Sequence, residues 1–331
     1  MDFVKLGISE VCDRLERYER YLLLMHSSPD GDTLGSCMAL SSILSLMGKS
    51  SYIVYPDKQF PEYLRPFLSV PVYSPKEAEG LEFDRAICVD VASPAQLRDN
   101  YETYKDKIFM SVDHHGNGTP MSDCLLTPDA AATGEIIYDI ACELIARKRI
   151  GELPTDAAEA IYLAISSDTG CFKYSNVTPK THRIAASLIE AGVRHSYINT
   201  LCFDSKSKKQ IEAEKIVYNN LHVLLDGKLT VAALDSKTKA GIQNEYFENA
   251  VNIARSVRGA VVSCSIKEKD EFPGEFRVSL RSSDTSVDVS KVCAEFGGGG
   301  HICAAGCSVT AENIDEAVCM IRDKVSEVLF R

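Results

Sequence analysis

YLLLMHSSPDGDTLG, residues 21–35, joins a short apolar run to a loop of ionisable side chains. The run over 21–25 is continuous and short, which is typical of a buried strand. An Asp-Gly pair follows, and apolar residues at helical spacing begin at Leu34, so the chain is expected to pass from strand to helix here. Ligands bind at the carboxyl ends of the strands in open α/β sheets. The stretch therefore predicts an α/β fold with a ligand site in the loop after its first strand.

Short apolar runs alternate with longer amphipathic stretches as far as Val193. This alternation is typical of strand and helix units around a mostly parallel sheet, and it predicts a doubly wound α/β domain. Its strands are expected at 21–25, 51–55, 85–89 and 107–112, and its helices at 34–47, 131–148, 155–166 and 179–191.

A polar, lysine-rich segment over 203–214 breaks this pattern and indicates an exposed helix or a linker. We therefore predict a first domain over 1–200, a linker over 201–218 and a smaller α/β domain over 219–331, with the active site in the cleft between the two domains. Asp226-Gly227 joins two alternating runs and favours a two-residue hairpin turn. Strands are expected at 221–225, 229–234, 260–266 and 275–280, and helices at 249–257 and, last, through Val325.

The 331 residues include 36 Lys and Arg against 47 Asp and Glu, a net charge of −11, which argues against a broad basic surface for duplex nucleic acid. A small anionic ligand needs only a local positive site of metal ions or a few arginines. No apolar run approaches the roughly 18 residues of a membrane span, and no secretory signal is visible, so we expect no membrane partner and a cytoplasmic protein. Twelve scattered cysteines without a Cys-x-x-Cys pair favour reduced, buried thiols.

Three side chains in the first loop have the chemistry of metal ligands. Asp32 alone is explained equally well as a helix cap, and Asp30 with Gly31 as a turn. His26 favours a site, because an imidazole and two carboxylates on one tight loop form a mixed nitrogen and oxygen ligand set for a divalent metal.

Ionisable residues also follow later predicted elements. Asp90 follows the run 85–89, where an isolated Asp is often a turn residue. Asp113-His114-His115 follows the run 107–112, and three consecutive ionisable groups at a sheet edge are hard to explain by packing. Asp168 at the end of an apolar helix opposes the helix dipole and calls for a compensating cation. Six residues could thus hold two divalent metal ions if one carboxylate bridges them: His26, Asp30, Asp32, Asp90, His114 and Asp168.

In the second predicted domain, a run of four glycines over 297–300 precedes His301 and the small residues Ala304-Ala305-Gly306. The run is either a flexible loop or a nest whose successive N–H groups bind a phosphate, with Gly298, Gly299, Gly300 and His301 at the ligand. Arg281, followed by Ser282, is either a surface residue or a fork for a terminal phosphate.

These motifs, in this order, resemble the DHH phosphoesterase superfamily. The resemblance rests on His-x-x-Pro-Asp-x-Asp from His26, the later Asp90, the Asp-His-His triplet and the Asp-Thr-Gly-x-Phe segment from Asp168. The glycine run and Ser279-Leu-Arg-Ser282 resemble the superfamily's associated C-terminal domain. Length and domain order are similar to the nanoRNase and phosphoadenosine-phosphate phosphatase subgroup.

The resemblance implies a role for each matched residue. His26, Asp30 and Asp90 would hold one metal ion, and Asp32, Asp90, His114 and Asp168 the other, so that Asp90 bridges. Asp113 would orient a neighbouring histidine, His115 would face the substrate phosphate, and Arg281 would contact substrate. The metal would be manganese by resemblance, although the ligands also suit iron, zinc or cobalt.

The implied activity is hydrolysis of short oligoribonucleotides to mononucleotides and dephosphorylation of 3′-phosphoadenosine 5′-phosphate, by a hydroxide that bridges the two metals. A phosphodiesterase for linear or cyclic dinucleotide messengers is an alternative within the same class. A non-catalytic nucleotide sensor is the alternative from another class, but such a protein is expected to have lost ligands, and none is missing. The oligomeric state stays open, a homodimer included.

Overall fold

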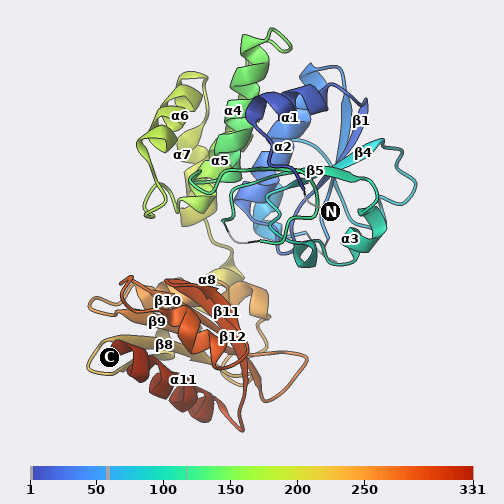
Figure 1. The fold of residues 1–331 in the computed structure, drawn as a ribbon. Helices are drawn as coiled ribbons and strands as arrows, with labels where there is room; N and C mark the ends of the chain where they lie inside the picture. The colour runs from blue at the N-terminus through green and yellow to red at the C-terminus, as the bar shows by residue number, and fades with distance from the viewer. Residues whose placement is uncertain (1–2, 57–59, 117, 331) are drawn as a thin grey trace. The chain divides into compact units, whose positions relative to one another are not determined.

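The structure is a computed structural model that describes residues 3–56, 60–116 and 118–330. The chain forms two compact units, Met1–Ser205 and Lys206–Arg331 (Figure 1). The division lies within the predicted linker, and much of that segment is the helix α8 (Lys208–Asn219). A short π-helical turn, Thr200–Asp204, closes the first unit.

Unit 1 contains a six-stranded parallel sheet in the order β3-β2-β1-β4-β5-β6. The chain adds β2 and β3 on one side of β1 and then β4, β5 and β6 on the other side, so the winding direction changes between β1 and β4. This is the doubly wound topology that the sequence predicts. The strands are β1 (Arg20–Leu24), β2 (Ser50–Val54), β3 (Val72–Tyr73), β4 (Arg85–Val89), β5 (Ile108–Asp113) and β6 (Cys124–Leu126).

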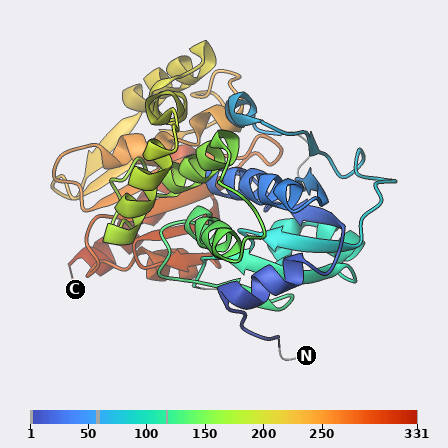
Figure 2. The same ribbon diagram turned by 90° about the horizontal axis from the view of Figure 1, so that it is seen from above.

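Helices α2, α4 and α5 lie side by side in unit 1 (Figures 1 and 2). A Cβ atom on Gly35 of α2 would lie 2.3 Å from the carbonyl oxygen of Ala160 in α5, and one on Gly134 of α4 would lie 2.5 Å from Ala164 Cβ. Only glycine allows the helix backbones to approach each other so closely. This packing places the N-termini of α2 and α4 beside the C-terminal end of α5. The helices are α1 (Ile8–Leu15), α2 (Gly31–Leu46), α3 (Asp99–Tyr104), α4 (Thr133–Ala146), α5 (Thr155–Asp168), α6 (Pro179–Glu190) and α7 (His195–Asn199).

Unit 2 contains a second six-stranded sheet, in the order β11-β12-β10-β9-β8-β7. Only β8 and β9 pair in parallel; the other neighbours are antiparallel. Helices α10 and α11 pack on one face over an apolar core, and α8 and α9 pack on the other face over β8. The elements are β7 (Leu221–Leu224), β8 (Leu229–Leu234), α9 (Ala250–Arg255), β9 (Val262–Glu268), β10 (Glu275–Ser282), α10 (Val289–Ala294), β11 (Gly299–His301), β12 (Ala304–Thr310) and α11 (Ile314–Leu329).

The turn between β7 and β8 is longer than the predicted two residues. Four residues, 225–228, connect the strands, and Leu225, Asp226 and Gly227 have φ angles of 52°, 52° and 83°. The Asp-Gly signal located the turn correctly, but Leu225 is also drawn into the left-handed region. The two-residue prediction is wrong because β7 ends at Leu224, one residue before its apolar run does, and β8 begins only at Leu229.

No helix in the described part of the chain is both long enough and apolar enough to cross a membrane. All twelve cysteines lie within that part and are free thiols, several of them buried in the cores. The many cysteines therefore form no disulfide framework in this fold.

Candidate metal centre

The loop after β1 places His26 and Asp30 together. Asp30 is the N-cap of α2, where its Oδ1 accepts hydrogen bonds from the backbone N–H groups of Asp32 and Thr33 at 3.0 and 3.1 Å. His26 Nδ1 lies 2.8 Å from the carbonyl oxygen of Ser27, so the Nδ1–H donates there and the lone pair of Nε2 is left for a ligand. His26 Nε2 lies 3.6 Å from Asp30 Oδ1. Asp30 therefore caps the helix and takes part in the cluster at the same time.

Asp90 lies at the carboxyl end of β4 and joins this group, with its Oδ2 3.4 Å from His26 Nε2. Its side chain is almost fully buried and its φ angle is 61°, in a region that L-residues rarely occupy. Such strain persists only where surrounding contacts hold it and is common at functional sites. One of those contacts is Thr133, whose Oγ1 donates to Asp90 Oδ1 at 2.9 Å.

Asp32 is completely buried at the start of α2 and is held by the first turn of α4. Its Oδ2 accepts from the Thr133 N–H at 2.7 Å, and its Oδ1 accepts from the Gly134 N–H and from Ser36 Oγ, both at 3.0 Å. Unpaired N–H groups and the helix dipole at an N-terminus stabilise a carboxylate. Even so, burial, together with the nearby charges of Asp90 and Asp168, raises the pKa of Asp32 well above its usual range.

His114 and Asp168 complete a second group with Asp32. His114 Nδ1 lies 3.1 Å from the Ala130 carbonyl oxygen, which directs Nε2 toward the carboxylates. Nε2 lies 3.3 Å from Asp168 Oδ2 and 3.7 Å from both Asp32 Oδ2 and Asp90 Oδ1. Asp168 is the last residue of α5.

The six predicted ligands thus form two overlapping groups that meet at Asp90, and they fit divalent metal ions. Within the described residues, His114 Nε2 is a buried nitrogen without a hydrogen-bond partner, although carboxylates surround it. Burial disfavours a charged imidazole, yet these carboxylates raise the pKa of His26 to about 11 and that of His114 to about 10. A site that attracts protons to buried imidazoles attracts cations, and its imidazole and carboxylate donors suit first-row divalent metals.

His115 and Asp113 form a pair at the metal groups, where His115 Nδ1 also lies 3.6 Å from Asp90 Oδ1 and could join Asp90 and His114 around an ion. Asp113 Oδ1 accepts from the backbone N–H groups of His114 and His115, at 2.8 and 3.2 Å, and lies 2.8 Å from His115 Nδ1. The hydrogen bond to Asp113 raises the pKa of His115. The His115 side chain is 36% exposed, so its other ring nitrogen is accessible to a ligand.

In unit 2, the first two N–H groups of the predicted phosphate nest already have acceptors within the protein. The N–H groups of Gly297 and Gly298 donate to the carbonyl oxygens of Ala294 and Cys293, where they end helix α10. Gly299 and Gly300 begin strand β11 instead of a loop. Cβ atoms at Gly298 and Gly300 would lie 2.2 and 2.5 Å from carbonyl oxygens of β12, so these glycines are explained by strand packing.

The other predicted residues of unit 2 lie close to one another. Arg281 of β10 and His301 of β11 both pair in register with Ala304 of β12, so they flank it in one row of the sheet. Arg281 also donates to the Leu280 carbonyl oxygen at 2.9 Å. Ser282 is buried, and its Oγ donates to the Asp284 carbonyl oxygen at 2.8 Å, which occupies this hydroxyl in a local turn.

Sequence reasoning missed the residues that hold the ligands. Thr133, Gly134 and Ser36 contact Asp32 or Asp90, but none is ionisable and none lies in a recognised motif. The available signal was the Thr-Gly-Glu stretch from Thr133, near the start of the helix predicted over 131–148, because the free N–H groups of a helix N-terminus bind carboxylates.

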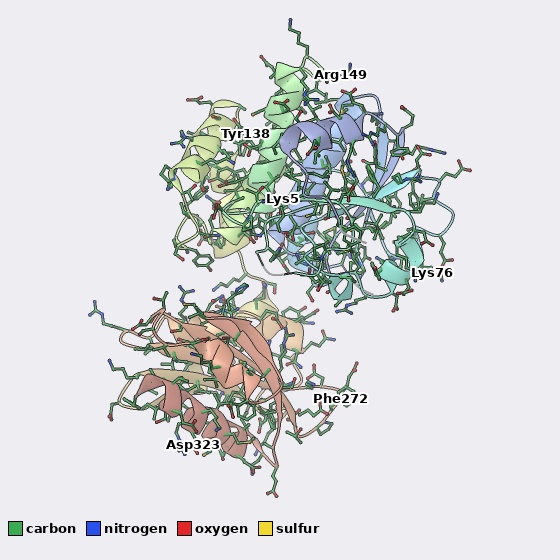
Figure 3. All side chains as sticks on the ribbon, viewed as in Figure 1. Lys5, Lys76, Tyr138, Arg149, Phe272 and Asp323 are labelled. Atoms are coloured by element: carbon green, nitrogen blue, oxygen red, sulfur yellow. The ribbon has the colours of Figure 1, made fainter. Side chains whose placement is uncertain are left out.

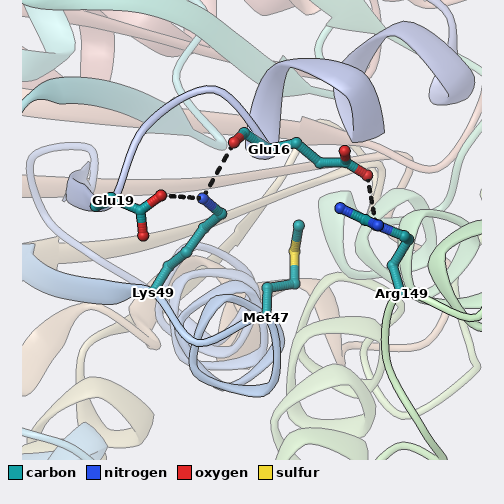
Figure 4. A pocket seen from close by; sticks show the side chains of 5 residues that line it. All are labelled: Glu16, Glu19, Met47, Lys49 and Arg149. Carbon is teal, nitrogen blue, oxygen red and sulfur yellow. Dashed lines mark hydrogen bonds and ion pairs between the residues drawn. The ribbon is translucent and has the colours of Figure 1, made fainter.

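The cavity in Figure 4 lies at the amino ends of β1 and β2, away from the candidate metal centre at the carboxyl ends of the strands, since Glu19 precedes β1 and Lys49 precedes β2. Met47 and Lys49 follow the C-terminal end of α2, whose N-terminal end is at the metal centre, and Arg149 follows the far end of α4 (Figure 3). The cavity measures about 260 Å³. Lys49 pairs with Glu19 at 3.2 Å and Arg149 with Glu16 at 2.7 Å, so its charged groups already have partners.

Comparison with known proteins identifies both units. The family described as "DHH family, N-terminal domain" matches residues 20–165, and the one described as "DHHA1 domain" matches residues 226–327. The chain is 27% identical over 308 residues to the "Bifunctional oligoribonuclease and PAP phosphatase NrnA" of Thermus thermophilus, covering 92% of this chain and 89% of that one. It is 26% identical to the Bacillus subtilis protein of the same description, covering 91% and 93%.

Among solved structures, an exopolyphosphatase-related protein from Bacteroides fragilis has the same fold, with a TM-score of 0.86 and 22% identity over 97% of this chain and 95% of that one. The two family matches follow each other in the expected order, and the relatives are similar over about nine-tenths of the chain. The cluster of potential metal ligands lies at the DHH motif. The chain belongs to the DHH family of phosphoesterases, which are hydrolases, and carries a DHHA1 domain after its DHH domain.

Proposed function

We propose that this protein hydrolyses short oligoribonucleotides to mononucleotides and dephosphorylates 3′-phosphoadenosine 5′-phosphate (PAP). The observation that carries the proposal is the cluster around Asp90, in which every ligand position of the DHH motifs is present and buried or half-buried. Its support is the similarity, along nearly the whole of both chains, to relatives described as oligoribonucleases and PAP phosphatases. A sensor that binds nucleotides without turnover would have no need of this complete set.

Two divalent ions suit the two ligand groups, with manganese as our proposed metal. His26, Asp30 and Asp90 would hold one, and Asp32, Asp90, His114 and Asp168 the other. Bound there, the ions would neutralise phosphoryl oxygens and supply a water of lowered pKa. The protein's own contribution is to fix the donors: carbonyl oxygens orient both imidazoles, and the N-terminus of α4 holds Asp32.

His115 is proposed as the group that acts on the substrate phosphate. Asp113 holds its Nδ1 at 2.8 Å, which fixes the ring and leaves Nε2 for the substrate. A protonated imidazole so placed can donate a hydrogen bond to a phosphoryl oxygen, or a proton to the leaving oxygen. Asp113 is a positioning residue in this scheme, because it touches His115 and not the substrate.

In the second unit, Arg281 and His301 are proposed to bind a substrate phosphate. Their shared row in the sheet, on either side of Ala304, puts a guanidinium and an imidazole beside small residues. Gly299 remains a candidate for backbone contact, since a Cβ atom there would meet nothing within 4 Å. The net charge of −11 favours short substrates over long polyanions.

The test is a product time course with manganese on four substrates: a diribonucleotide, a pentaribonucleotide, a long single strand and PAP. We expect mononucleotides from the two short RNAs, phosphate release from PAP and little digestion of the long strand. Asp90→Asn should abolish all of these activities. Turnover of no phosphoester would overturn the enzyme proposal, and efficient digestion of the long strand would overturn the preference for short substrates. Turnover confined to the dinucleotide would favour a messenger-degrading phosphodiesterase.

A further inference from the structure

One face of the unit 2 sheet carries a polar row that the proposed function uses only at one end. Along β10, Arg277, Ser279 and Arg281 alternate with three residues of the apolar core. Because successive side chains of a strand point to opposite faces, these three polar residues share the face away from α10 and α11. Arg277 and Arg281 are four residues apart, which is about 13 Å along a strand. A mononucleotide cannot contact both, but a chain of several nucleotides can.

The surface between the two arginines is built of small residues. On β12, Gly306 pairs in register with Ser279, and Ser308 pairs with Arg277; both are exposed. No bulky side chain occupies these register positions. Between Arg281 and Arg277, β10 and β12 therefore present only small side chains on this face, and this row is the path along which an extended polyanion would lie.

At the Arg277 end of this path lies a cavity of about 350 Å³ that Phe272 also lines. Phe272 belongs to the turn between β9 and β10, and its side chain is 54% exposed (Figure 3). The ammonium group of Lys269 lies 6.0 Å from the centre of its ring and is itself paired with Glu275 Oε2 at 2.8 Å, so the cation left for a phosphate at this end is Arg277. An exposed aromatic face beside cations is the arrangement by which proteins bind single-stranded nucleic acid, with a base on the ring and a phosphate on the cation.

The charges around the cavity leave Arg277 available. Three carboxylates line it: Glu248 is paired with Lys267 at 2.8 Å, Asp270 with the buried Lys239 at 2.5 Å, and the third, Glu271, is exposed to solvent. Lys267 is also the cross-strand neighbour of Arg277, so two cations face each other in register. Arg277 has no ion pair with any residue that the structure describes. Glu248 already offsets the charge of Lys267, so the charge that a bound phosphate would neutralise here is that of Arg277.

We propose that Arg277 and Phe272 form a second nucleotide subsite, in which Arg277 pairs with a phosphate and Phe272 stacks on a base of an oligoribonucleotide bound at Arg281. The inference rests on the proposed function and names a determinant of its substrate length. PAP and dinucleotides are too short to occupy both ends of the path. Substrates of several nucleotides gain affinity from the second subsite.

The experiment measures equilibrium binding to the full chain with manganese present, by fluorescence anisotropy. The probes are a labelled diribonucleotide and a labelled pentaribonucleotide, both with phosphorothioate linkages that resist hydrolysis. Arg277→Ala and Phe272→Leu are each expected to weaken pentanucleotide binding about tenfold and to leave dinucleotide binding within about twofold of wild type. Arg277→Ala should also reduce the salt dependence of binding by about 0.7 in log–log slope, whereas Phe272→Leu should not change it.

Two further variants serve as controls. Phe272→Tyr keeps the ring and should bind like the wild type. Arg322→Ala removes one positive charge from α11, on the opposite face of the sheet, and should have no effect on either probe. Equal affinity of the wild-type protein for both probes, equal losses on both lengths, or an effect of Arg322→Ala as large as that of Arg277→Ala would overturn the subsite. Because binding is measured without turnover, failure of the proposed enzymatic activity would show in the product time course and not here.

Discussion

Thr133 Oγ1 lies 2.9 Å from Asp90 Oδ1, at the point where the two groups of candidate metal ligands meet. The backbone N–H of the same residue donates to Asp32 Oδ2 at 2.7 Å. One residue at the start of α4 therefore contacts a carboxylate at the start of α2 and another at the end of β4. Thr133 itself is fully buried, so neither hydrogen bond competes with solvent. The metal centre depends on helix α4 as much as on the loops that carry the ligands.

Thr133→Val is expected to weaken manganese binding by about 10- to 100-fold, the usual effect of removing a group that orients a metal ligand. Valine keeps the shape of the side chain and the backbone hydrogen bond to Asp32, so only the hydroxyl contact with Asp90 is lost. Thr133→Ser retains that hydroxyl and should bind manganese nearly as well as the wild type. Isothermal titration with manganese measures the affinities, and circular dichroism checks the fold. Equal affinities for the two variants would contradict the role of the hydroxyl.

His115→Ala is expected to lower kcat by about 10²- to 10⁴-fold while manganese content stays near the wild-type level, because His115 is assigned to the substrate and not to a metal. Elemental analysis of the purified variant and a kinetic assay on the diribonucleotide measure the two effects. His222→Ala removes a histidine from strand β7 of the other unit and should change neither quantity. A parallel loss of metal from His115→Ala would reassign this residue as a ligand.

Metal removal is expected to destabilise the protein. Three buried or half-buried carboxylates, Asp32, Asp90 and Asp168, repel one another when no cation lies between them. Manganese at 100 times its Kd should add about 2.7 kcal/mol to the free energy of unfolding, and a chelator should remove that gain. Thermal unfolding with and without manganese measures it.

Asp90→Asn is the matched control for this measurement. Asparagine tolerates the left-handed backbone conformation at this position, where φ is 61°, so the variant should fold. Its unfolding temperature should no longer respond to manganese. An undiminished response would place the metal elsewhere in the molecule.

The sequence could indicate the candidate ligands because they lie in the segments that follow buried strands, or at the end of an apolar helix, and parallel strands end at one edge of a sheet. It could not predict Thr133 or Gly134, because their contacts with Asp32 depend on how α4 packs against α2. The glycine run shows the opposite failure: its composition suggested a phosphate nest, yet Gly298 is required by close contact with β12. Strand β3 was missed because two residues carry no periodicity.

The free energy of unfolding is also expected to depend on pH above the ordinary pKa of a thiol, because of a buried cysteine in the core of unit 2. Burial raises the pKa of Cys264 well above 9.0, because its thiolate would lie in the apolar interior. The unfolded chain therefore loses this proton at lower pH than the folded protein does. The group contributes stability fully below the unfolded pKa and loses it as pH rises from about 9 toward the raised folded value, at up to about 1.4 kcal/mol per pH unit.

Cys264→Ala removes that contribution to the slope. Urea unfolding between about pH 8 and pH 10 should show a shallower decline for this variant than for the wild type. Its stability at the lower pH will be reduced by the small cavity, so the slope and not the absolute value is the readout. Cys319→Ala, which removes an exposed thiol from α11, controls for loss of a cysteine as such and should leave the slope unchanged. If Cys264→Ala keeps the wild-type slope, this thiol does not govern the loss of stability at alkaline pH. A shallower slope assigns part of that loss to Cys264 in strand β9.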